Sequence, residues 1–221
     1  MLPLRDDVVG RSRPFAVAAL LAANAIVFAV CVSQDPAEAA AWLDRWGLVP
    51  RIFLASLDGA PQIAWVTPFT SIFLHGGLFH LAGNALYLWI FGRTIEDLLG
   101  WQRFLVFYVA CGLAAGLVHV ASSPTSFLPT IGASGAISGL LGAYAVSYPT
   151  GRLRLMWPAV RVPAIGFLFL WIALQVMSGV ASWGETGGGV AWWAHVGGFV
   201  AGVGLARSMW VRRPTRSRHR I

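Results

Sequence analysis

Residues 129–144 read PTIGASGAISGLLGAY, a stretch of small and apolar residues that carries no charge. Gly135 and Gly139 are four residues apart, and small residues at that interval let helix backbones approach closely inside a membrane. Ser134 lies among these glycines, with Gly132 two positions before it. A serine in such a helix is most often a packing residue, so the rest of the chain has to show whether its hydroxyl has a chemical role.

The composition around this stretch is that of a membrane protein. Of the 221 residues, 57% are hydrophobic and 11% are charged. A soluble domain this apolar could not cover its surface with polar groups, so we predict an all-α polytopic membrane protein. The formal net charge of +7 could indicate binding to nucleic acid, but the basic residues flank hydrophobic runs, as orientation signals do in membrane proteins. We therefore expect a lipid bilayer and no nucleic acid as partner.

Six apolar runs are candidates for membrane helices, and they cover residues 14–33, 77–92, 104–122, 132–148, 162–180 and 190–206. A crossing needs about 20 residues, at about 1.5 Å each, to span about 30 Å of hydrocarbon. The second and fourth runs are shorter than this, which fits tilted helices or a locally thinned bilayer. We predict a six-helix membrane domain over 14–206, a basic N-terminal tail over 1–13 and a basic C-terminal tail over 207–221.

One long connection, residues 34–76, joins the first two runs. Its large apolar residues recur at short, partly helical intervals and few charges separate them; they include Trp42, Trp46, Val49, Ile52 and Phe53. This pattern predicts an amphipathic first outer loop that is associated with the membrane interface.

The basic residues are all arginines, and their distribution predicts the topology. Fourteen of the sixteen fall in the two tails and in the loops after the second and fourth runs. With six crossings these fourteen share one side of the membrane, and only Arg45 and Arg51 lie on the other. The positive-inside rule then places both termini in the cytoplasm. An odd number of crossings would destroy this segregation.

Four polar residues fall inside the apolar runs at similar depth. His80 and Asn84 are four residues apart and share one helix face, Ser134 opens the fourth run, and His195 lies near the outer part of the sixth. Polar and ionisable groups at such depth are costly and usually line an interior site or a water-filled cavity. Their coincidence in the outer half of the bilayer indicates a site.

The glycines predict how Ser134 and His195 meet. Gly135 directly follows the serine, and Gly198 and Gly202 repeat the four-residue interval just beyond the histidine. Close packing of these two helices would carry the hydroxyl toward the imidazole, and a serine needs such a base to become a nucleophile. None of the nine carboxylates lies inside a run at the depth of His195, so the residues favour a Ser–His dyad over a triad with an acid.

A haem- or quinone-binding membrane subunit is a rival from another functional class. It would use His80 and His195 as axial ligands on separate helices, but it gives no role to Ser134, Gly132 or Asn84. Neither cysteine has the spacing of a metal ligand. We therefore expect no cofactor and no metal.

Three motifs, taken together and in this order, indicate a family. They are HGGLFHLAGN at 75–84, GASG at 132–135 and AHVGGFVAG at 194–202. From roughly residue 62 to residue 206 the chain resembles the rhomboid family of intramembrane serine proteases. The resemblance implies a six-transmembrane-helix bundle and hydrolysis of peptide bonds within or beside the transmembrane segments of other membrane proteins.

The resemblance also implies roles for single residues. Ser134 matches the nucleophile and His195 the general base, while His80, Asn84 and the backbone N–H of Ser134 match the groups that stabilise the oxyanion. The supporting residues are Gly132, Gly135, His75, Gly198 and Gly202.

Other features of the family can be matched as well. Glu96 resembles a structural acid at the cytoplasmic end of the second helix, and residues 182–192 resemble a mobile cap, with the fifth helix beside it as a lateral gate. Some family members carry a tyrosine against which the imidazole packs, whereas this chain has Ser138. They also have an arginine beside the tryptophan that matches Trp65, and this chain has none there. What holds the imidazole in place is left open.

A catalytically silent rhomboid-like protein that binds transmembrane segments is the second alternative. Such a protein would be expected to lack the serine or the histidine, and both are present. We expect an integral protein of a bacterial plasma membrane whose active site opens to the outer side and whose partners are transmembrane protein substrates. The identity of the substrates and the oligomeric state are left open.

Overall fold

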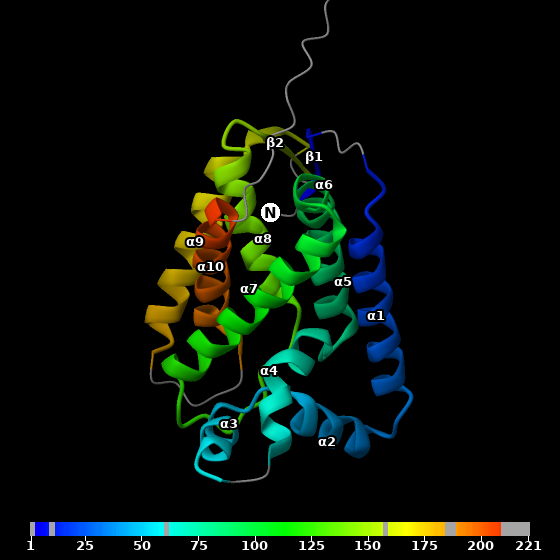
Figure 1. Ribbon diagram of the computed structural model, residues 1–221, viewed down its shortest axis with the longest axis vertical. Coiled ribbons are helices and arrows are strands. Elements are labelled where there is room, and N and C mark those ends of the chain that lie inside the picture. The colour runs from blue at the N-terminus through cyan, green and yellow to red at the C-terminus, as the bar shows by residue number, and fades with distance from the viewer. Residues whose placement is uncertain (1–2, 9–11, 60–61, 157–158, 184–188, 209–221) are drawn as a thin grey trace, which may run out of the picture.

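The computed structural model describes residues 3–8, 12–59, 62–156, 159–183 and 189–208. Helices dominate it, and the helices that correspond to the predicted runs are α1 (Phe15–Val32), α5 (Leu78–Tyr87), α7 (Trp101–Ser122), α8 (Ser134–Ser147), α9 (Ala164–Ala181) and α10 (Trp192–Ser208). They pack side by side in one bundle (Figure 1). The C-terminal tail predicted over 207–221 lies outside the described residues beyond Ser208.

The second helix is longer than its apolar run. α5 continues through a π-helical segment, η3 (Leu88–Gly92), into α6 (Arg93–Leu99). Gly100 ends this helix with a φ of 78°, a left-handed conformation that glycine adopts without steric cost, and α7 starts at the next residue.

Three helices in the described part of the chain are long and apolar enough to cross a membrane: α1, α7 and α9. α8 is apolar but has only 14 residues, and α10 has 17. The number of crossings therefore stays a prediction.

The long connection between α1 and α5 folds into several short helices at one end of the bundle. They are α2 (Pro36–Trp46), α3 (Pro50–Leu57), η1 (Gln62–Val66), α4 (Thr67–Thr70) and η2 (Ser71–Phe73). Prolines are the first residues of α2 and α3 and the second residue of α4, where the missing N–H costs no helical hydrogen bond. The Asp35 carboxylate caps α2 by accepting from two backbone N–H groups.

The opposite end carries a small antiparallel sheet, so the all-α prediction is incomplete. Its strands are β1 (Pro3–Asp6), β2 (Arg152–Leu155) and β3 (Arg161–Pro163), in the order β1-β2-β3. β2 alternates exposed arginines with the buried Leu153 and Leu155, which is the two-residue period of a half-buried strand. Four residues are too few for this period to stand out beside a topology signal made of the same arginines.

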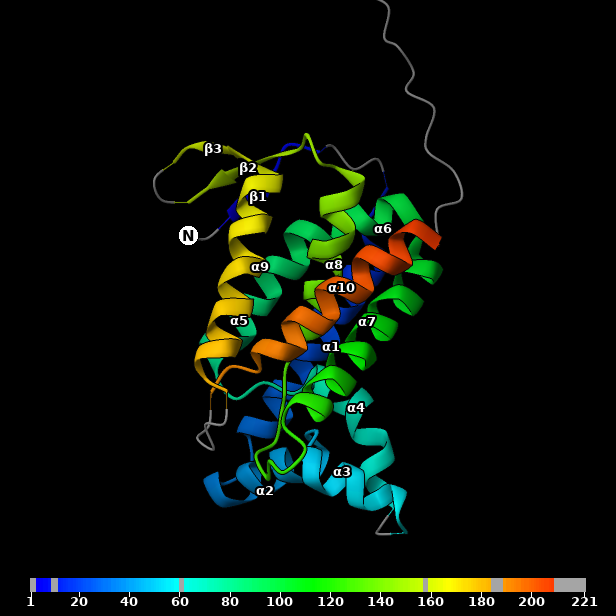
Figure 2. The same ribbon diagram turned by 90° about the vertical axis from the view of Figure 1, so that its left-hand side faces the viewer.

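The predicted segregation of arginines agrees with the two ends of the bundle. Of the arginines in the described residues, eight belong to the sheet, to helix ends beside it or to the segment before α1 (Arg5, Arg13, Arg93, Arg103, Arg152, Arg154, Arg161 and Arg207). Arg45 and Arg51 belong to α2 and α3 at the far end, as Figure 2 shows.

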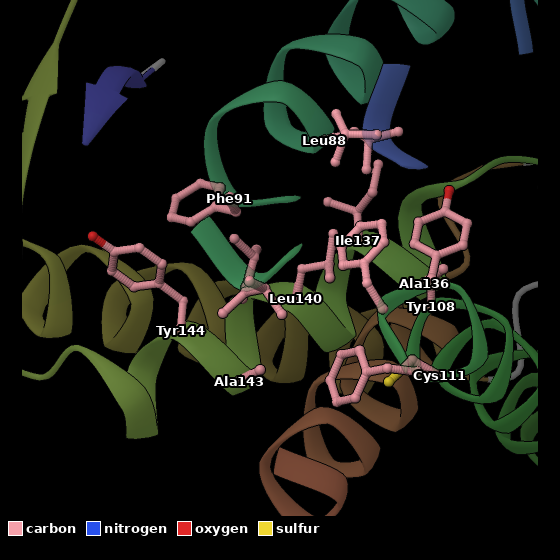
Figure 3. Packing of buried hydrophobic residues seen from close by; sticks show 14 of the residues in the cluster. Leu88, Phe91, Tyr108, Cys111, Ala136, Ile137, Leu140, Ala143 and Tyr144 are labelled. Carbon is pink, nitrogen blue, oxygen red and sulfur yellow. The ribbon is translucent and has the colours of Figure 1, made fainter. Parts of the chain in front are cut away.

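The centre of the bundle is α8, which is buried from Gly135 to Tyr144. Its large side chains meet those of the π-helical segment: Ile137, Leu140 and Tyr144 lie toward Leu88 and Phe91 in Figure 3. The Phe91 and Tyr144 rings pack edge to face, 5.2 Å between centroids. A serine at the start of α8 is therefore attached to the buried centre of the bundle.

Glu96 attaches α1 to this core. Its buried carboxylate accepts hydrogen bonds of 2.8 Å from the backbone N–H groups of Ala16 and Val17, in the first turn of α1. These donors have no partner within their own helix, and the carboxylate satisfies both.

Candidate active site

Ser134 is the first residue of α8, and Gly132 shapes the turn before it. Gly132 has a φ of 122°, and its N–H donates to the Ser71 carbonyl at 2.8 Å. The backbone conformation requires glycine, and a Cβ there would also lie 2.7 Å from Nε2 of His80 and displace that ring.

Ser134 and His195 are in direct contact. The distance between Ser134 Oγ and His195 Nε2 is 2.8 Å, a normal length for a hydrogen bond between them. The two residues come from α8 and α10, which are 61 positions apart in sequence. The site therefore contains a hydroxyl hydrogen-bonded to a potential base.

Glycines bring α8 and α10 into backbone contact. A Cβ on Gly198 would collide with the carbonyl oxygen of Gly135, and a Cβ on Gly202 would collide with that of Gly139. The two glycine pairs thus lie opposite each other at the four-residue interval. This close approach is what places His195 within reach of Ser134.

The other nitrogen of the imidazole contacts α9. His195 Nδ1 lies 2.7 Å from Oε1 of Gln175, and Nε2 of Gln175 donates to the Trp171 carbonyl at 3.4 Å. A carbonyl oxygen can only accept, so Nδ1 carries the proton and Nε2 is left as the acceptor for the Ser134 hydroxyl. Gln175 is 7% exposed. No carboxylate takes this position.

Trp171 packs against the imidazole where other family members are expected to use a tyrosine. Its ring lies 5.9 Å from the His195 ring at 38°, and the Trp192 ring lies edge-on at 6.5 Å. Ser138 turns back along α8 instead, and its hydroxyl donates to the Ser134 carbonyl at 2.6 Å. The packing partner thus comes from α9.

His80 and Asn84 of α5 face the same turn. The position of a Cβ on Gly132 is 2.7 Å from His80 Nε2 and 3.7 Å from Asn84 Nδ2, so both side chains converge beside Ser134. Asn84 is 7% exposed, and its buried Nδ2 finds no hydrogen-bond acceptor among the described residues. Such a donor costs about 1–3 kcal/mol, and it suits an oxygen that gains charge during a reaction.

Comparison with known proteins indicates the same family as the three sequence motifs. The rhomboid domain matches residues 62–212. The chain belongs to the rhomboid family. With its apolar helices, this rhomboid is an integral membrane protein.

Its relatives include mitochondrial and bacterial proteins. Presenilin-associated rhomboid-like protein, mitochondrial, from Mus musculus is 31% identical over 170 residues, 76% of this chain and 42% of the relative. The protein of that name from Homo sapiens gives the same values. Rhomboid protease GluP from Bacillus subtilis (strain 168) is 44% identical over 82 residues, 37% of this chain and 16% of that protein. The rhomboid described here spans less than half the length of these relatives.

His75, the third predicted histidine of this rhomboid, lies in the loop before α5. Its Nδ1 donates to the Phe73 carbonyl at 3.2 Å, and its ring lies 5.1 Å from the His80 ring. Burial, and to a smaller extent the neighbouring His80, lower the pKa of His75 to about 4, so it is neutral at physiological pH. It supports the His80 ring and does not reach Ser134 by any hydrogen bond of the described structure.

Gln175 and Trp171 are the site residues that the sequence interpretation missed. Gln175 is the one amide in the run 162–180, a polar residue inside an apolar helix like His80 and Asn84, and this signal could have marked it. Of the predicted cap 182–192, residues 184–188 lie outside the described residues. Among the described residues, no group of three or more histidines, cysteines or acids could hold a metal ion.

Proposed function

We propose that this rhomboid is an intramembrane serine endopeptidase that hydrolyses peptide bonds in or next to transmembrane segments of other membrane proteins. The observation that carries the proposal is the 2.8 Å contact between Ser134 Oγ and a His195 nitrogen that is free to accept a proton. Rhomboid protease is part of the name of the bacterial relative GluP, which supports the same activity here.

In the proposed reaction His195 Nε2 takes the hydroxyl proton as Ser134 Oγ attacks the substrate carbonyl carbon. The tetrahedral intermediate collapses when its C–N bond breaks, and the imidazolium gives its proton to the leaving amine. Water then attacks the acyl-enzyme with the same histidine as base, which releases the acid product and regenerates the serine. His195 alone supplies both proton transfers.

The oxyanion of the intermediate would form beside Gly132. His80, the Nδ2 of Asn84 and the backbone N–H of Ser134, which is at a helix N-terminus, are donors suited to hold it. The unpartnered Nδ2 would gain its acceptor only as negative charge develops, which is the condition for stabilising a transition state more than the ground state.

The expected setting is a six-span domain over 14–206 with tails at 1–13 and 207–221. Both termini would be cytoplasmic and the site would open to the outer side, as the segregation of arginines indicates. We place this rhomboid in a bacterial plasma membrane. Its partners would be transmembrane substrates, which have to unwind locally before Ser134 can attack.

The haem alternative is disfavoured by the contacts of His195. An axial ligand needs a free ring nitrogen, but Nδ1 is bonded to Gln175 and Nε2 to Ser134. The silent alternative is decided by experiment.

Labelling with a fluorophosphonate probe tests the nucleophile. The native protein in detergent or vesicles should be labelled and should cleave a reporter transmembrane segment, while Ser134→Ala should lose both. Ser208→Ala, at an exposed serine on the last turn of α10, is the matched control and should behave as the native protein. Equal labelling and cleavage by Ser134→Ala would overturn the proposal, and so would a native protein that binds the segment without cleaving it.

A further inference from the structure

The imidazole that the proposed function uses is held in large part by a helix that carries no proposed catalytic residue. Gln175 bonds its Nδ1 and Trp171 packs against its ring, and both residues belong to α9. They are four residues apart and therefore share one face of the helix.

We propose that Gln175 and Trp171 are positioning residues that fix the tautomer and plane of His195, so that the place of α9 in the bundle determines whether the base can act. This inference rests on the proposed function. Without the Gln175 oxygen, nothing would favour the proton on Nδ1, and an imidazole protonated on Nε2 cannot accept the Ser134 proton.

α9 lies at one edge of the bundle. It lies on the outside of the bundle in Figures 1 and 2, and much of its apolar surface is exposed, with Phe169 71%, Met177 67% and Val180 60% exposed. Its contact with α10 includes Gly179, where a Cβ would lie 3.1 Å from the Trp193 ring. The helix is thus attached on one side and faces lipid on the other.

Outward displacement of α9 would remove the support of the base. A hydrogen bond of 2.7 Å is lost when its partner moves by about 1 Å, and Trp171 would move with Gln175. If α9 moves outward, the His195 ring therefore loses both contacts that orient it. When α9 returns, these contacts form again. A substrate would then enter while α9 is displaced, and Ser134 would become active only after α9 has returned.

The first test changes the Nδ1 partner and measures kcat, KM and the pH dependence of reporter cleavage. Gln175→Met removes the acceptor and keeps a side chain of similar length. We expect kcat to fall at least about tenfold with little change in KM, but less than the roughly 10⁴-fold found when the acid of a Ser–His–Asp triad is changed. A Gln175→Met variant with native kcat and native pH profile would overturn the inference.

Gln175→Glu is the conservative substitution to compare with Gln175→Met. It keeps an acceptor at Nδ1 and should retain most of the activity lost by the Met variant. Its carboxylate favours the protonated imidazole, so the pH at which activity is half lost on the acidic side should move upward by about one unit or more. A Gln175→Glu variant no more active than Gln175→Met would contradict the positioning role.

A spectroscopic test works without turnover. In protein labelled with ¹⁵N-histidine and carrying Ser134→Ala, the His195 nitrogens should show the Nδ1–H tautomer, and adding Gln175→Met should shift them toward Nε2–H. The two proposals can thus fail separately. If Ser134→Ala cleaves the reporter at the native rate, the proposed protease function is wrong. If cleavage depends on Ser134 but the variant with both Ser134→Ala and Gln175→Met keeps the Nδ1–H tautomer, only the proposed positioning role of Gln175 is wrong.

A wedge between α9 and α10 tests the dependence on helix position. Gly179→Leu would press on Trp193 one turn from Gln175, whereas Gly166→Leu, on the same helix, meets nothing within 4 Å and is the control. We expect Gly179→Leu to lower kcat by the same order as Gln175→Met, and Gly166→Leu to keep the native value. A wedge variant as fast as its control, or faster, would contradict the inference.

Discussion

At the scale of single residues, the site is defined by which polar atoms have partners and which do not. Both nitrogens of His195 are bonded inside the protein, so the ring is held in one orientation. Asn84 is the opposite case, because its buried Nδ2 has no acceptor among the described residues. A buried donor without an acceptor, beside the Ser134–His195 hydrogen bond, fits the proposed stabilisation of an oxyanion.

Asn84→Ala tests this reading of the unpartnered donor. We expect kcat for reporter cleavage to fall about tenfold to a thousandfold, the usual effect of losing one oxyanion donor. The midpoint of thermal unfolding should stay close to the native value, because the substitution breaks no side-chain hydrogen bond of Nδ2.

A buried amide elsewhere gives the control for Asn84→Ala. Asn24 on α1 is 2% exposed, lies outside the site and also has a buried side-chain atom, Oδ1, without a partner among the described residues, so Asn24→Ala should keep the native kcat. If Asn84→Ala loses stability but not kcat, its amide is structural.

The candidate residues could be predicted from the sequence where burial of a polar group is costly. His80, Asn84 and His195 interrupt apolar runs, and that cost is visible without coordinates. Gln175 gives the same signal, but its partner on α10 is 20 positions away and no short motif joins them. The packing of Trp171 on the imidazole depends on how α9 sits in the bundle, which a single sequence does not encode locally.

At the scale of helices, glycine determines how closely α8 can be packed. α10 lies against its Gly135 and Gly139 carbonyls, while on the α7 side a Cβ on Gly135 would lie 2.6 Å from the Cβ of Ala115. α8 is therefore enclosed between two helices that both approach its backbone. Any added methyl group on these faces must move a helix.

Gly198→Ala tests the contact between α8 and α10. The new methyl would collide with the Gly135 carbonyl, and overpacking of this kind costs about 1–3 kcal/mol. We expect a lower midpoint of thermal unfolding and a large loss of kcat, because separation of the helices draws His195 away from Ser134. Gly204→Ala adds the same methyl on α10 in open space and should change neither quantity. Native kcat in Gly198→Ala would show that the contact is not required.

The helices themselves were easier to predict than what joins them. The apolar runs agree with α1, α7, α8, α9 and α10 to within a few residues, because hydrophobicity alone marks them. The run at 77–92 misses α6, since the helix continues past Gly92 into polar residues. The sheet was missed because its first strand lies about 150 residues from the other two, and such pairing leaves no local pattern.

At the scale of the whole molecule, charge separates the two ends of the bundle. The sheet and the adjoining helix ends hold most of the described arginines, and the connection that contains α2 and α3 holds two. Exposed apolar residues lie on the helices between the ends, for example Ile26, Val106 and Phe169. An apolar middle between an arginine-rich end and an arginine-poor end is the arrangement of a membrane protein with a fixed orientation.

This orientation predicts which end an impermeant maleimide can reach from outside the cell. Asp44→Cys on α2 should be labelled in intact cells, whereas Arg154→Cys on β2 should be labelled only in inverted vesicles. The native protein is the blank for both, because Cys31 and Cys111 are buried. Labelling of both variants from one face would contradict a bundle that crosses the membrane between α2 and the sheet, and labelling of Arg154→Cys alone in intact cells would reverse the proposed topology. Since Ser134 begins α8, and α8 runs from the side of α2 toward the sheet, the same result also shows which side of the membrane the Ser134 end of α8 faces.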